Sequence, residues 1–276
     1  MEIDIAQQLT TLGHPQRLSI FRLLMRRYPD RVPAGEIGDA LELKPSTLST
    51  YLASLHACGL VSQRRAGTSL RYTVAIDRAR AMIDFLALDC CRGRPDICIN
   101  FGSEHTEQKD KFNVLFLCTR NSARSIFAEA ILTKLAADRF NVYSAGTQPS
   151  GDLPRESIQT LVHNGHSVAS HRSKSLAEFQ TNDAPVMDFV FTVCDKAANE
   201  ECPVWEGQPI SAHWGIPDPV HTDGTDAEKT LAFQTAYNRI LNRLRAFTQL
   251  PLTSLDRISL QNAVDRIADI STDKDE

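Results

Sequence analysis

Six of the seven cysteines in this 276-residue chain fall into two groups of three. The first group lies in one short segment and the second is spread along the later part of the chain: Cys90, Cys91 and Cys98, then Cys118, Cys194 and Cys202. No apolar run reaches the ~18 residues of a membrane helix, and the N-terminus has no basic region followed by an apolar one. We therefore expect a cytoplasmic protein with no membrane partner. Because thiols stay reduced in that compartment, these cysteines favour metal binding or catalysis over structural disulfides.

Cys118 ends a nearly continuous apolar run and opens the segment Cys-Thr-Arg-Asn-Ser-Ala-Arg-Ser. With a strand before it and a helix after it, this segment predicts a loop whose backbone N–H groups converge on a tetrahedral oxyanion at the helix N-terminus. Arg124 can hold two oxygens of that anion in its guanidinium fork, and Ser125 can hydrogen-bond the thiolate. We expect the positive field to lower the pKa of Cys118, which would make it a nucleophile at neutral pH. This oxyanion loop comprises Thr119, Arg120, Asn121, Ser122, Ala123, Arg124 and Ser125.

The elements that must position Cys118 alternate between strands and helices. The apolar residues 111–118 are typical of a strand that is buried on both faces. A helix, a strand, a helix, a strand and a long helix are expected next, over residues 125–137, 141–144, 155–164, 188–194 and 226–250. This order predicts an α/β domain, residues 111–250, with a central parallel sheet flanked by helices. Residues 251–276 are expected to form a helical extension with a charged tail.

Residues 1–91 are punctuated like a compact, mainly α-helical domain. Pro45 suits the first position of a helix over residues 46–58, and a period-two pattern then predicts a β-hairpin over residues 60–74. A helix followed by such a hairpin predicts a winged helix-turn-helix, and a further helix is expected over about residues 76–91. The polar residues 92–110 are expected to be a linker, which carries part of the first cysteine group.

DNA binding by this domain has to be local, because the net charge of −4 gives no general attraction to nucleic acid. The exposed face of the predicted helix offers short donors and acceptors suited to the major groove, and the hairpin arginines could contact phosphate. The candidate contacts are Lys44, Ser46, Thr47, Ser49, Thr50, Tyr51, Arg64, Arg65 and Arg71.

Residues 111–250 resemble the low-molecular-weight protein tyrosine phosphatases and their relatives, the thioredoxin-coupled arsenate reductases. The likeness rests on the oxyanion loop and on the later segment Trp-Gly-Ile-Pro-Asp-Pro. The resemblance implies that Asp218, in that segment, is the general acid that protonates the leaving oxygen. Arg120 and Ala123 depart from the glycine and second cysteine that the family often has in its loop, and the charge of Arg120 could alter substrate preference.

Cys194 and Cys202 separate the two activities of that family. A phosphatase hydrolyses its cysteinyl intermediate with water and needs no further thiol, whereas a reductase must supply two electrons. The resemblance implies arsenate as substrate, Cys118 as nucleophile, Cys194 as the attacking thiol and Cys202 as the resolving thiol. A thioredoxin-like reductant would then reduce the disulfide, with no tightly bound cofactor. The polar segment between Cys194 and Cys202 suits thiol–disulfide exchange, which needs a loop that can relocate.

Residues 10–75 resemble the arsenic-responsive repressors of ArsR type. The likeness rests on Leu-Gly-His-Pro-Gln-Arg-Leu, on Lys-Pro-Ser-Thr-Leu-Ser-Thr-Tyr-Leu-Ala-Ser-Leu, and on Gly-Leu-Val before a basic hairpin. The resemblance implies operator DNA as a partner and a homodimer. The helix expected over residues 35–43 carries no cysteine, so the sensor candidates are Cys90, Cys91 and Cys98, whose thiolates could bind As(III) or Sb(III) as inducer.

Together the two cysteine groups favour an arsenite-responsive repressor fused to an arsenate reductase. An alternative is a transcription regulator fused to a phosphotyrosine phosphatase, which would share Cys118, Arg124 and Asp218. A third hypothesis is a DNA-binding sensor whose second domain is inactive.

Overall fold

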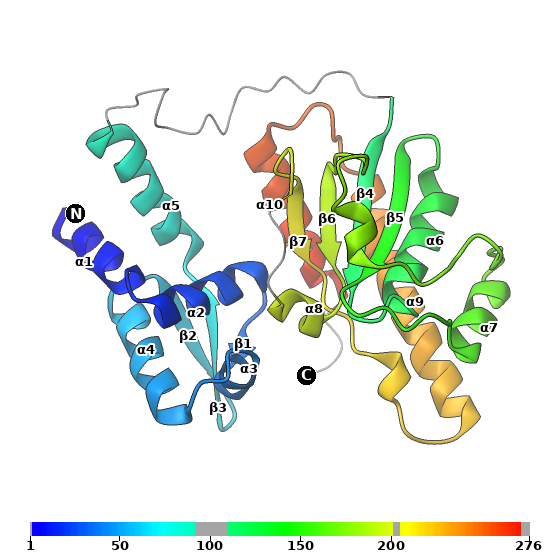
Figure 1. The fold of residues 1–276 in the computed structure, drawn as a ribbon, viewed down its shortest axis with the longest axis horizontal. Coiled ribbons are helices and arrows are strands. Elements are labelled where there is room, and N and C mark those ends of the chain that lie inside the picture. Colours follow the sequence, from blue (N-terminus) through cyan, green and yellow to red (C-terminus); the bar gives the residue numbers. More distant parts are fainter. Residues whose placement is uncertain (1, 92–109, 201–204, 272–276) are drawn as a thin grey trace. The chain divides into compact units, whose positions relative to one another are not determined.

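The computed structural model describes residues 2–91, 110–200 and 205–271. The chain divides into two compact units, Met1–His105 and Thr106–Glu276 (Figure 1). Among the described residues, no helix has both the length and the apolarity that a membrane crossing requires.

The N-terminal unit packs helices around a small antiparallel sheet, whose strands lie in the order β1–β3–β2. Its elements are α1 (Glu2–Leu12), α2 (Pro15–Arg26), β1 (Val32–Pro33), α3 (Ala34–Ala40), α4 (Pro45–Ala57), β2 (Val61–Ala66), β3 (Ser69–Val74), α5 (Ile76–Asp84) and η1 (Phe85–Cys90). The hairpin of β2 and β3 directly follows α4, which confirms the predicted winged helix-turn-helix (Figure 1).

The sequence of α4 explains both its limits and its buried face. Pro45 occupies the first turn, where its missing N–H costs no helical hydrogen bond. Leu48, Leu52 and Leu55 recur at helical spacing and are buried in the core of the unit. Gly59, at φ +76°, provides the left-handed residue that commonly follows a helix. The opposite face, with most of the candidate DNA contacts, is left exposed.

A four-stranded parallel sheet in the order β5–β4–β6–β7 forms the centre of the second unit, which confirms the predicted α/β class. The elements are β4 (Phe112–Cys118), α6 (Arg124–Ala136), β5 (Phe140–Gly146), α7 (Arg155–His163), η2 (Leu176–Phe179), β6 (Phe189–Thr192), α8 (Asp195–Asn199), β7 (Ile210–His213), η3 (Pro219–His221), α9 (Asp226–Thr248), α10 (Arg257–Ile267) and η4 (Ala268–Ser271). The larger core packs α6, α9 and α10 on one face of the sheet, and a smaller core packs η2 on the other.

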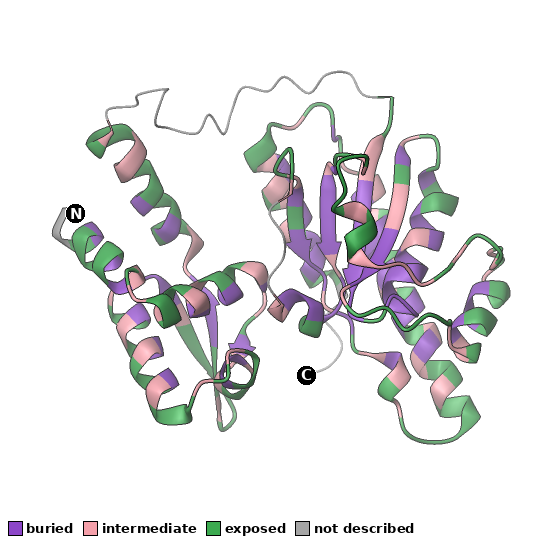
Figure 2. Ribbon diagram, in the orientation of Figure 1, coloured by how far each residue is buried: buried purple, intermediate pink, exposed green. Residues whose placement is uncertain are grey.

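Strand β4 brings Cys118 to the edge where the parallel strands end. Val114 and Phe116 lie in the larger core, and the alternating Leu115 and Leu117 lie in the smaller one. Figure 2 shows this strand as a largely buried element in the middle of the sheet. Because both of its faces are covered, it has the continuous apolar sequence that led to the strand prediction. The carboxyl ends of β5 and β6 flank Cys118, so side chains from three chain segments can meet there.

Three elements differ from the sequence-based expectations. No strand was expected where β7 adds to the sheet beside β6. The helix expected over residues 76–91 is α5 followed by η1, a π-helical stretch. Residues 251–276 were expected outside the second domain, whereas Leu260 and Val264 of α10 are buried in its larger core.

Candidate active site

The candidate nucleophile lies at the base of the oxyanion loop, between the end of β4 and the start of α6. The Cys118 side chain is only 3% exposed. Its Sγ accepts a hydrogen bond from the backbone N–H of Asn121 at 3.1 Å and lies 2.9 Å from the Ser125 Oγ. The loop therefore places a backbone donor and a hydroxyl on the sulfur, as a stabilised thiolate requires.

Asn121 connects this loop to two distant segments. Its backbone has φ +47°, a left-handed conformation that asparagine tolerates better than most residues. Its Nδ2 donates to the Ser125 Oγ and to the Ser144 Oγ, each at 2.8 Å. Its Oδ1 accepts from the Lys174 backbone N–H at 2.7 Å. Since Asn121 is fully buried, these bonds fix the turn of the loop without competition from water.

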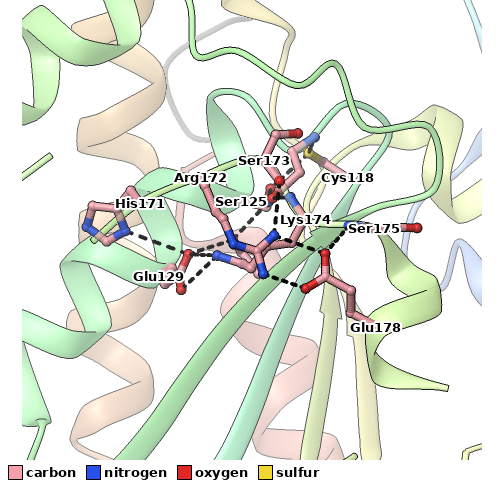
Figure 3. Close-up of polar contacts among 11 residues, drawn as sticks. Cys118, Ser125, Glu129, His171, Arg172, Ser173, Lys174, Ser175 and Glu178 are labelled. Atoms are coloured by element: carbon pink, nitrogen blue, oxygen red, sulfur yellow. Dashed lines mark hydrogen bonds and ion pairs between the residues drawn. The ribbon is translucent and has the colours of Figure 1, made fainter. Parts of the chain in front are cut away.

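Figure 3 shows a charged network around Glu129, and this network reaches Asn121 through Ser144 and Lys174. The Ser144 hydroxyl donates to the Glu129 carboxylate at 2.6 Å, the Lys174 Nζ lies 2.9 Å from the same oxygen, and the His171 Nδ1 lies 3.7 Å from it. Burial by itself would raise the pKa of Glu129. The nearby His171 imidazole, the Lys174 charge and the Ser144 hydroxyl outweigh it and hold the pKa of Glu129 below its usual range. These residues form no recognisable motif in the sequence, although the strand expected over residues 141–144 ends beside Cys118 in a parallel sheet.

Gly146 lets β5 approach the loop closely. It pairs with Cys118 in the parallel register, and its N–H donates to the Lys174 carbonyl. A Cβ at this position would lie 2.7 Å from the Thr119 carbonyl oxygen and 3.0 Å from the Asn121 backbone nitrogen. A side chain here would therefore displace the backbone of the oxyanion loop.

Arg124 is held by the segment that carries the candidate acid. Its Nη1 donates to the Ile216 carbonyl at 2.8 Å, and its Nη2 lies 2.5 Å from the Asp218 Oδ2. The Asp218 Oδ1 also accepts from the Val220 N–H at 3.2 Å. The structure thus brings Arg124 and Asp218 together at the loop that begins with Cys118.

The electrostatics of Cys118 differ from the expectation. Burial raises the pKa of the Cys118 thiol, and the neighbouring Cys194 raises it further. Ser125, Arg124 and the Asn121 N–H lower the pKa, but the balance remains upward. The predicted lowering of the pKa is therefore wrong for this arrangement, because burial of the thiol, with Cys194 beside it, outweighs the positive field of the loop.

The second thiol lies beside the oxyanion loop. Cys194 follows β6, is buried, and places its Sγ 3.4 Å from the Thr119 Oγ1. The same sulfur accepts a hydrogen bond from the Ala197 N–H at 3.4 Å, so it caps the N-terminus of α8. Cys202 lies outside the described residues.

The candidate sensor and DNA contacts are in the N-terminal unit. Cys90 ends η1 and is exposed, Cys91 follows it and is half-buried, and Cys98 lies outside the described residues. Most of the candidate DNA contacts are exposed; the members of this group are Lys44, Ser46, Ser49, Thr50, Arg64, Arg65 and Arg71. Thr47 and Tyr51 are half-buried, and the Tyr51 hydroxyl lies 3.4 Å from the His14 Nε2.

Comparison with known proteins covers both units. Residues 113–259 match the low molecular weight phosphotyrosine protein phosphatase family, and residues 14–63 match the bacterial regulatory proteins of the arsR family. The chain is 34% identical to the arsenate reductase of Bacillus subtilis strain 168 over 136 residues, which are 49% of this chain and 94% of that enzyme. It is 32% identical to the arsenate reductase of Halalkalibacterium halodurans over 136 residues, with the same two coverages, 49% and 94%. A solved structure described as an arsenate reductase in the phosphate binding state is 25% identical, with a TM-score of 0.38 and coverage of 49% of this chain and 95% of that one. By its sequence matches, the chain belongs to the low-molecular-weight phosphotyrosine protein phosphatase family, as a fusion with an ArsR-family helix-turn-helix domain on its N-terminal side.

Proposed function

We propose that this protein serves arsenic resistance in two ways, in the cytoplasm. Its second unit reduces arsenate to arsenite with its own thiols, and its N-terminal unit represses transcription until arsenite binds. The activity of the similar enzymes supports the first part, and the ArsR-family match supports the second.

The position of Cys194 is the observation that favours reduction of arsenate over hydrolysis of a phosphate ester. Its sulfur lies against Thr119 of the oxyanion loop, and Cys194 is near enough to Cys118 to raise the pKa of the Cys118 thiol. A phosphatase that hydrolyses a cysteinyl intermediate with water has no need of a second buried thiol at this place. A reductase needs one within reach of the first sulfur, because the two electrons must come from a pair of thiols.

In the first step, the Cys118 thiolate attacks arsenic in arsenate held by the oxyanion loop. A sulfur–arsenic bond forms, and the bond from arsenic to one hydroxyl oxygen breaks as that oxygen accepts a proton and leaves as water. Arg124 would bind arsenate oxygens through its guanidinium group, for which it would exchange its contact with Asp218. Asp218 would then face the leaving oxygen and donate the proton.

In the second step, the Cys194 sulfur attacks the Cys118 sulfur. The sulfur–arsenic bond breaks with its electron pair kept by arsenic, so that As(V) leaves as arsenite and a Cys118–Cys194 disulfide forms. Cys202 then attacks Cys194 and releases the Cys118 thiolate. A dithiol reductant of the thioredoxin class reduces the Cys194–Cys202 disulfide, and no tightly bound cofactor takes part.

The N-terminal unit would bind operator DNA as a homodimer, with α4 in the major groove. Arg64 and Arg71 lie directly opposite each other in the hairpin register, and both are exposed. Like charges at such positions destabilise a hairpin unless an anion lies between them, which suits a phosphate contact. Arsenite or Sb(III) bound by Cys90, Cys91 and Cys98 would act as the inducer.

The test is arsenate turnover coupled to thioredoxin and thioredoxin reductase, followed through NADPH consumption. We expect Cys118→Ser, Cys194→Ser and Cys202→Ser to abolish steady-state turnover. Cys58→Ser is the matched control, since Cys58 lies in the N-terminal unit, and it should keep the wild-type rate. Sustained turnover by Cys194→Ser would rule out the thiol cascade.

Hydrolysis of aryl phosphates is the second candidate function, because Cys118, Arg124 and Asp218 would serve phosphate ester cleavage with the same geometry. Rapid turnover of p-nitrophenyl phosphate that is unaffected by Cys194→Ser, without arsenate reduction by the wild type, would favour it.

A further inference from the structure

The segment that carries Asp218 is held by the C-terminal helix. This acid segment, residues 214–218, runs from the end of β7 to η3. Helix α10 packs along β7 (Figure 1), and most of it lies beyond residue 259, where the match to the phosphatase family ends. Its support of the acid segment is therefore a feature of this chain that the family match does not cover.

Trp214 provides the first connection. Its indole is 2% exposed, and its Nε1–H donates to the Val264 carbonyl of α10 at 3.3 Å. The ring stacks on Phe191 of β6 at a centroid distance of 4.1 Å and an interplanar angle of 11°. The start of the acid segment is thus fixed between the sheet and the C-terminal helix.

Arg243 provides the second connection. This α9 residue is 4% exposed, and its Nη1 donates to the Gly215 carbonyl at 3.2 Å. Its Nη2 donates to the Ala268 carbonyl at 2.8 Å, at the point where α10 ends. One guanidinium therefore joins the acid segment to the carbonyl end of α10, where a positive charge is favoured by the helix dipole.

The next residues of the same segment contact the oxyanion loop. The Ile216 carbonyl accepts from Arg124, and the Asp218 carboxylate pairs with Arg124. Trp214 therefore contacts α10, Gly215 contacts Arg243, and Ile216 contacts Arg124. This segment is so short that a displacement of its first residues is passed on to its last. A shift at Gly215 moves the carboxyl group that would donate the proton.

We propose that Arg243 and α10 are positioning elements of the active site, which hold the acid segment so that Asp218 reaches the leaving oxygen. Arg243 does not touch the reacting atoms and acts through the Gly215 carbonyl. This inference rests on the proposed function only in assigning proton donation to Asp218.

The test measures single-turnover loss of thiols after arsenate is added to the full-length, reduced protein. We expect Arg243→Met to lower the rate by about tenfold, since displacement of a reacting group by a fraction of an ångström can cost that much. Arg243→Lys, which keeps one donor, should react at a rate between those of the wild type and Arg243→Met. Arg266→Met is the matched control, because the Arg266 side chain is exposed and donates within its own helix, and it should stay within about twofold of wild type.

A double-mutant cycle separates positioning from a general loss of stability. If Arg243 acts through Asp218, Arg243→Met should slow the Asp218→Asn variant by no more than about twofold. The inference is overturned if Arg243→Met keeps the wild-type rate, or if it costs the same tenfold in the Asp218→Asn background. If the wild type loses no thiols with arsenate, the proposed function fails. In that case the effect of Arg243→Met is compared in the wild-type and Asp218→Asn backgrounds with hydrolysis of p-nitrophenyl phosphate, which uses the same Asp218. The outcome decides whether Arg243 positions the acid segment.

Discussion

Replacing Gly146 with alanine tests whether the backbone of the oxyanion loop sets the reaction rate. The new Cβ would lie 2.7 Å from the Thr119 carbonyl oxygen, 3.0 Å from the Arg120 carbonyl carbon and 3.0 Å from the Asn121 nitrogen. Ordinary contact begins near 3.4 Å, so the loop must retreat from β5 by about 0.7 Å. All three neighbours are backbone atoms, and no side-chain rotation can relieve the overlap.

The retreat moves the Asn121 N–H away from the Cys118 sulfur, because that N–H and the crowded nitrogen are the same group. A misplacement of this size should lower the single-turnover rate between about tenfold and about a hundredfold, or about 1.4 to 2.7 kcal/mol in the barrier. Overpacking should also lower the free energy of unfolding by about 1–3 kcal/mol.

The assay is the rate of thiol loss with arsenate, measured beside the melting temperature. Gly35→Ala is the control, because a Cβ there meets nothing within 4 Å and its helical position favours alanine. The control should keep the wild-type rate and melt at the same temperature or higher. A Gly146→Ala protein that reacts at the wild-type rate would refute the claim that close approach of β5 shapes the loop.

Three further predictions concern pH, DNA and the inducer. The pKa of Glu129 is lowered in the folded state, so its contribution to stability is complete above the ordinary value of 4.5 and is lost as the pH falls through the lower folded value. Glu129→Gln should therefore flatten the fall of melting temperature below that pH, and parallel curves for the two proteins would contradict this. Arg64→Ala should weaken operator binding and reduce the slope of log K against log salt by about one, whereas an unchanged slope would exclude a phosphate contact. Cys90→Ser should bind operator DNA like the wild type yet stay bound when arsenite is added, and normal release would remove Cys90 from the sensor.

The local parts of the site could be predicted from the sequence, and its long-range parts could not. The loop from Cys118 to Ser125 is contiguous, so a strand, a turn and a helix fix most of its geometry. Ser144 and Lys174 bond to Asn121 from segments far along the chain. Whether these two residues reach Asn121 depends on which strand pairs with β4, and the sequence pattern does not encode the order of strands in the sheet.

Strand β7 could not be predicted from the sequence for a related reason. Its four residues, Ile210–His213, are too few for a periodic signal, and polar Ser211 and buried His213 interrupt the apolar pattern. Tertiary contacts create the strand, because β6 pairs with it and α10 packs along it. The same contacts explain why α10 belongs to the larger core although its sequence indicates only an amphipathic helix.

The charges around Cys118 argue for an order of events in the proposed reduction. Cys194 raises the pKa of Cys118 because two negative sulfurs side by side repel each other. Arsenate in the loop would draw Arg124 from Asp218 toward the oxyanion next to Cys118, so the thiolate forms where its target already lies. Formation of the sulfur–arsenic bond then removes the negative charge from Cys118. With that charge gone, a thiolate at Cys194 is no longer repelled by a negative charge on the Cys118 sulfur, and it can attack that sulfur. The electrostatic coupling that disfavours two thiolates at once therefore makes the two thiols act in sequence.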